Sequence, residues 1–112
     1  MMLGRGLPEP VANLYREARE CVQLSAYTAS ALATRTLLMN IAANQGAAAG
    51  QSFGFYLDYL TANGFVPTRA SGWLDHIRRT GDVPPHEIPT VTEADAQELI
   101  AFLDMVLKTA FD

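Results

Sequence analysis

The stretch AYTASALATRTLLMNIAANQG, residues 26–46, decides the fold. Its apolar residues are spread around almost the whole helical axis, and Arg35 is its one charged residue. A helix that is apolar on all sides is normally buried among other helices. The stretch therefore predicts a central, most buried helix over residues 26–44, with Ser25 as its N-terminal cap and Gly46 at its end.

Four further segments of the chain have the apolar periodicity of one-sided helices. The first runs from about residue 8 or 9 to residue 23, with its prolines in the first turn, where a missing N–H has no cost. A third helix is expected between a Ser52 cap and Gly64. A short fourth helix carries Trp73 and ends at Gly81. The pair Thr92 and Asp95 forms the start signal of the last helix.

The class of fold follows from these segments. Strand signals are absent, because β-branched residues are scattered and no alternation is sustained. A chain of 112 residues is one domain by length. We expect an all-α, small up-and-down bundle of four to five helices over residues 8–112, preceded by a tail at residues 1–7.

Composition excludes several classes of protein. The net charge is −4, so a general nucleic-acid binder is not expected. One cysteine, Cys21, and two histidines do not make a cysteine-rich metal site, and the glycines form no nucleotide-binding motif. We therefore predict no metal and no cofactor. Without a signal peptide or an apolar run long enough to cross a membrane, we expect a cytoplasmic protein with no membrane contact.

Several spaced features of the sequence match a known family. They are Arg35 and Leu38 in the apolar helix, then Ile77, Arg78, Gly81, Asp82 and His86, then Thr92 to Ala96. In this order they resemble the bacterial domain of unknown function 4145, over roughly residues 8 to 111. The resemblance implies a fold similar to the HEPN superfamily (higher eukaryotes and prokaryotes nucleotide-binding), whose members often dimerise and accompany defence proteins.

The resemblance also implies a candidate catalytic pair. Many HEPN domains are metal-independent ribonucleases with an arginine a few residues ahead of a histidine, and Arg79 and His86 meet this spacing. On an unbroken helix the two would share one face, so that the imidazole could take a proton while the guanidinium stabilises negative charge. However, Pro84 and Pro85 end the helix between them. The favoured interpretation is that His86 is structural and fixes its loop.

Three other polar residues are candidate binding groups: Arg35, Arg78 and Asp82. A guanidinium in an apolar helix needs a partner. Arg35 could contact a phosphate or substrate, but we favour a structural pair with Asp75, Asp82 or Glu87. Arg78 and its neighbouring arginines form either a basic spot or a solvated face. His76 is expected on the solvent side of the fourth helix.

Two functions are compatible with these observations. We favour a non-catalytic, self-associating interaction module of a defence or regulatory system, with a protein partner. The alternative is an HEPN-type ribonuclease that binds RNA and uses Arg79 and His86. Phe102 and Phe111 lie outside the apolar stripe of the last helix, so we expect them in a homodimer interface. Alternatively, they contact the first helix of their own chain and the protein is a monomer.

Overall fold

The long helices in the described part of the chain are all α-helices, and Ala70 before the fourth of them is in a 3-10 turn. The computed structural model describes residues 6–67, 70–81, 87–88 and 90–111. Its helices are α1 (Glu9–Gln23), α2 (Tyr27–Asn44), α3 (Phe53–Ala62), α4 (Ser71–Gly81) and α5 (Glu93–Phe111). No strand occurs in these ranges. The prediction of an all-α bundle is confirmed, and the described residues form five α-helices.

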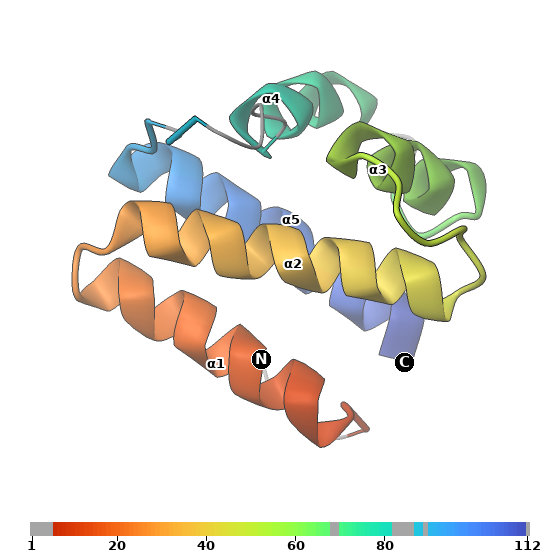
Figure 1. Ribbon diagram of the computed structural model, residues 1–112, viewed down its shortest axis with the longest axis horizontal. Coiled ribbons are helices and arrows are strands. Elements are labelled where there is room, and N and C mark those ends of the chain that lie inside the picture. Colours follow the sequence, from red (N-terminus) through yellow and green to blue (C-terminus); the bar gives the residue numbers. More distant parts are fainter. Residues whose placement is uncertain (1–5, 68–69, 82–86, 89, 112) are drawn as a thin grey trace.

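Helix α2 lies at the centre of this bundle. It contacts each of the other four helices, whereas α1 packs on α2 and α5. Figure 1 shows the long helices α1, α2 and α5 beside one another, with the shorter α3 and α4 on one side of them. Buried residues of α2, among them Leu37, Leu38 and Ile41, face these neighbours. The predicted central position of residues 26–44 is therefore confirmed.

The burial of α2 is less complete than its apolar sequence indicates. Its neighbours cover most of its circumference, but one side stays exposed and carries Ala29, Leu32, Thr36, Asn40 and Ala43. These residues are three or four positions apart, which places them on one face of a helix. Helices α1, α3, α4 and α5 approach α2 from its other sides and leave this face uncovered.

The contact between α1 and α2 includes a buried polar group. Ser30 of α2 donates a hydrogen bond of 2.8 Å from its Oγ to the backbone oxygen of Ala18 on α1. Both residues are fully buried. A buried hydroxyl is costly unless it is hydrogen-bonded, and this bond satisfies it. Two small residues facing each other also let the two helices approach closely.

The predicted cap at Ser25 is wrong. Helix α2 begins at Tyr27, its N-cap is Ala26, and no side chain caps it. Ser25 has a φ of 61°, in the left-handed region, and its N–H donates to the oxygen of Val22 at 3.0 Å. The N–H of Ala26 donates to the oxygen of Cys21 at 2.7 Å. This pair of bonds is the Schellman motif, so Ser25 ends α1 at the position that glycine usually occupies.

The other predicted helix ends agree with the structure. Ser52 caps α3 by accepting a hydrogen bond of 3.1 Å from the N–H of Phe55. Thr92 and Asp95 bind each other's backbone N–H reciprocally, at 3.2 and 3.1 Å, in the predicted capping box. Gly46 and Gly64 follow the C-caps of α2 and α3 with φ values of 110° and 83°. These φ values are ones that glycine adopts without strain.

The expected exposure of Phe102 is also wrong. Phe102 is 0% exposed, and its ring packs edge-on against that of Trp73 on α4, with centroids 5.6 Å apart. Helix α4 therefore widens the buried side of α5 beyond its main apolar stripe. Phe111 is half-buried and packs against the core. None of the described helices has both the length and the apolar character that a bilayer crossing needs.

Replacing Ser25 by glycine should stabilise the protein. The left-handed conformation costs a residue with a Cβ about 1 to 2 kcal/mol, and glycine avoids this while losing more backbone entropy on folding. We expect the free energy of unfolding to rise by about 0.5 to 1 kcal/mol, measured by urea denaturation with an unchanged m-value. As a matched control, Ser52→Ala should lower it by about 1 kcal/mol, because a cap is lost. A destabilised Ser25→Gly variant would contradict the left-handed assignment.

Candidate functional site

Arg78, a predicted binding residue, is used to join two helices. It lies in the last turn of α4 and donates a hydrogen bond of 3.2 Å from Nη1 to the backbone oxygen of Gly54 on α3. Its Nη2 pairs with the carboxylate of Asp58, also on α3. With two nitrogens bound to one helix, Arg78 holds α4 on α3. Its guanidinium is therefore largely occupied by these contacts within the chain, and a binding role for Arg78 stays a prediction.

Arg35 is half-buried on α2, and its guanidinium carbon lies 5.9 Å from the ring centroid of Phe53. This distance is within the range of a cation–π contact. The Nε atom is buried and has no hydrogen-bond partner among the described residues.

No ion pair of Arg35 with Asp75 or Glu87 occurs in the described ranges, and Asp82, the third expected partner, lies outside them, so the structural pair of Arg35 stays a prediction. In the described residues the guanidinium instead packs against the ring of Phe53, with its Nε buried.

The predicted catalytic pair is only partly placed. Arg79 is exposed near the end of α4, next to Arg78. His86 and Asp82, the third predicted binding residue, lie outside the described residues. Whether Arg79 and His86 share a cleft therefore stays a prediction.

His76 lies at the contact with α5 while 39% of its side chain stays exposed, so its expected place on the solvent side of α4 is only partly correct. Its Nε2 atom lies 3.4 Å from Oδ1 of Asp95 and 3.5 Å from Oε1 of Glu98. The orientation of α4 on α5 brings these three residues together. In α5, Asp95 and Glu98 are three residues apart, a spacing that places them on one face and that could be recognised in the sequence. That these two carboxylates lie close to His76 in the folded chain could not be recognised in the sequence.

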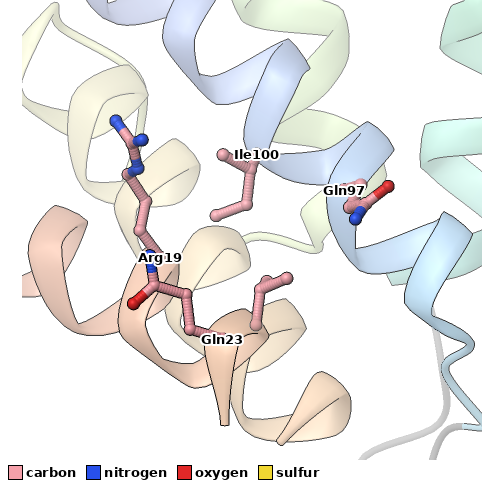
Figure 2. A pocket seen from close by; sticks show the side chains of 5 residues that line it. Arg19, Gln23, Gln97 and Ile100 are labelled. Carbon is pink, nitrogen blue, oxygen red and sulfur yellow. The ribbon is translucent and has the colours of Figure 1, made fainter. Parts of the chain in front are cut away.

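A groove of about 190 Å3 lies between α1 and α5 (Figure 2). Arg19, Val22 and Gln23 of α1 and Gln97 and Ile100 of α5 line it. The lining offers one cation, two amides and aliphatic surface, but no carboxylate, imidazole or thiol. Such a groove can hold a small polar group, but it has no residue that could act as a general base or nucleophile.

A polar network stands beside this groove and joins the same two helices. The hydroxyl of Tyr15 on α1 donates a hydrogen bond of 2.6 Å to Oδ1 of Asp104 on α5, and Nη1 of Arg19 donates to that hydroxyl at 3.1 Å. Burial raises the pKa of Tyr15, and the hydrogen bond to Asp104 raises it further. The phenol therefore stays protonated at neutral pH, as a structural donor.

The two adjacent arginines of α4 allow a matched test of these assignments. Arg78→Ala should lower the free energy of unfolding by about 1 kcal/mol, because it removes a partly exposed ion pair and a bond to a backbone oxygen. Arg79→Ala should change it by less than about 0.5 kcal/mol, as is usual for an exposed side chain. Urea denaturation measures both. Equal effects of the two substitutions would contradict the role of Arg78 as the link between α3 and α4.

Comparisons with known proteins identify a family and no function. A family model described as a domain of unknown function, DUF4145, matches residues 16–112. Searches of the curated proteins and of the solved structures found no match to the chain. The resemblance of the sequence to domain of unknown function 4145 is thereby confirmed. Because the match covers most of its length, the chain belongs to the DUF4145 family of domains of unknown function.

Proposed function

We propose that this domain is a non-catalytic interaction module that self-associates through the exposed side of α2. We call this side the α2 face and define it by Ala29, Leu32, Thr36, Asn40 and Ala43. The single observation that carries the proposal is that the face is exposed and yet has no charged residue. The exposed side of α1, by contrast, carries Arg16, Glu17 and Glu20.

The spacing of the α2 face suits a two-fold axis. Thr36 stands at its middle, with Leu32 and Asn40 four residues to either side and Ala29 and Ala43 seven residues to either side. In an antiparallel pair of α2 helices crossing at Thr36, Leu32 of one copy lies opposite Asn40 of the other. Each contact then occurs twice, as in an isologous dimer, the commonest closed assembly.

Leu32 has an apolar groove to enter in such a dimer. It is the exposed leucine of the α2 face, with 44% of its surface accessible. A groove of about 110 Å3 beside Asn40 is lined by Pro10, Val11, Leu14, Thr36, Leu37 and Asn40. Since Asn40 of one copy lies opposite Leu32 of the other, each leucine would pack on the groove of its partner. Because Leu32 is already more than half covered in the monomer, burying the rest of it is favourable by about 1 kcal/mol.

The charges of α2 also allow this association. The helix has no acidic residue, and its one cation, Arg35, is half-buried beside Phe53. Two copies could therefore meet through their α2 faces without placing carboxylates of α2 against each other. A stable dimer buries about 1,200 Å2 or more in total, so the first turns of α1 next to the groove would have to contribute.

This interface replaces the one expected around Phe102, because that ring is buried against Trp73 within the same chain. The biological setting in the proposal is the one that the HEPN resemblance implies: a bacterial, cytoplasmic defence or regulatory system in which the dimer binds another protein. The ribonuclease alternative still depends on Arg79 and His86. Cleavage of RNA in EDTA that both Arg79→Ala and His86→Ala abolish would favour it over the interaction module.

The substitution Leu32→Glu should break the dimer. By symmetry it would place a carboxylate in each of the two apolar grooves, where an unpaired charge is costly. We expect the wild-type protein to sediment at equilibrium, at micromolar concentration, with about twice its mass of 12.2 kDa. The variant should have a dimer dissociation constant more than about tenfold higher.

Ile88→Glu is the matched control for this experiment. Ile88 is 88% exposed and lies outside the α2 face. The same charge at this position should therefore leave the dimer unchanged. A wild-type protein that is monomeric at every concentration would contradict the proposal, and so would a Leu32→Glu variant that dimerises as the wild type does.

A further inference from the structure

Three side chains with metal-binding atoms converge where α4 meets α5. They are His76 from α4 and Asp95 and Glu98 from α5, and their ligand atoms all lie within 4.8 Å of one another. The three residues are each partly exposed, although the Nε2 atom of His76 is itself buried between the two carboxylates, so an ion would have to enter by a small movement of these side chains. From this cluster we propose a binding site for a divalent transition-metal ion, of which Zn2+ is the probe.

The separations of the three residues suit a common ion. Nε2 of His76 is 3.4 Å from Oδ1 of Asp95 and 3.5 Å from Oε1 of Glu98. Two ligands that each bind a zinc ion at about 2.1 Å with a tetrahedral angle between them are about 3.4 Å apart. A direct N–H···O hydrogen bond is shorter, about 2.7 to 3.2 Å. The two separations from His76 are therefore those of ligands around one ion, although a His–carboxylate ion pair has similar ones, and all three ligand atoms lie within 4.8 Å of one another.

Groups outside the cluster hold both carboxylates in this orientation. The backbone N–H of Thr92 donates to Oδ2 of Asp95 at 3.2 Å. The indole Nε1–H of Trp73 donates to Oε2 of Glu98 at 3.1 Å. In each carboxylate one oxygen is thus fixed by a donor and the other faces His76. Such outer hydrogen bonds are typical of metal sites, where they orient the ligands.

The donor set selects among metals. One imidazole nitrogen and two carboxylate oxygens suit zinc and neighbouring first-row ions, whereas Mg2+ and Ca2+ prefer oxygen ligands alone. Three protein ligands also leave at least one coordination position to water, as in open zinc sites. The bound ion would link α4 to α5 at the start of α5, in addition to the apolar contact of Trp73 with Phe102.

The competing interpretation is a protonated His76 that pairs with the two carboxylates without an ion. The two differ in what they need: the ion requires a neutral imidazole, whereas the ion pair requires a charged one. A titration with Zn2+ at pH 7.5 distinguishes the two interpretations, because binding of the ion supports the metal site and no binding supports the ion pair. This inference is independent of the proposed dimer, since none of the three residues belongs to the α2 face.

The experiment titrates the full chain with Zn2+ by isothermal calorimetry and follows the emission of Trp73, the single tryptophan, in parallel. All proteins carry Cys21→Ser, because a thiolate would bind zinc by itself. His76→Ala and Glu98→Gln remove one ligand each. His86→Ala is the matched control, since it removes the other of the two histidines. Circular dichroism checks that each variant is folded.

We expect one Zn2+ per chain, a change in Trp73 emission that saturates with it, and a higher melting temperature in the presence of the ion. Each ligand variant should bind at least about tenfold more weakly, while His86→Ala should bind as the parent does. Mg2+ at the same concentration should not reproduce the effect. Unchanged binding in both His76→Ala and Glu98→Gln, or a parent protein that does not bind Zn2+ at about 100 μM, would overturn the proposal.

Discussion

The packing of α2 against all four other helices is the constraint on which the rest of the structure depends. Its buried leucines and isoleucine need apolar partners on several sides, which α1 and α5 provide together with α3 and α4. Where α1 approaches closely, Ser30 must bond to the backbone of Ala18 to be buried at all. The same arrangement leaves one side of α2 exposed. A structural requirement for a central helix thus produces the surface on which the proposed function depends.

Local chemistry determined which features could be predicted from the sequence. The ends of α3 and the start of α5 depend on residues close in the chain, such as Ser52 and the pair Thr92 and Asp95, and these predictions are confirmed. The start of α2 was predicted wrongly because Ser25 has to end α1 first, in a conformation that glycine normally adopts. The short connection between the two helices has to provide both the end of α1 and the cap of α2. Its composition does not show which of these two roles Ser25 takes.

Features that depend on contacts between helices were the ones missed. On a helical projection of α5, Phe102 lies outside the apolar stripe, which predicts that it is exposed. In the structure Trp73 of α4 covers it. Arg78 and His76 stand two residues apart on α4, but Arg78 reaches α3 and His76 reaches α5. Their roles follow from the angle at which α4 lies across its neighbours. No periodicity within α4 specifies that angle, so neither the Arg78 link nor the His76 cluster could be found from the sequence.

Disulfide formation between two copies of α2 tests the central claim most directly. In a Cys21→Ser background, a cysteine at Thr36 stands on the proposed two-fold axis, whereas a cysteine at Thr61, which is exposed on α3, does not. Under mild oxidation at micromolar concentration, Thr36→Cys should give a cross-linked species of twice the 12.2 kDa mass, and Thr61→Cys should give little of it. Equal cross-linking of the two variants, or none from Thr36→Cys, would contradict an interface centred on α2.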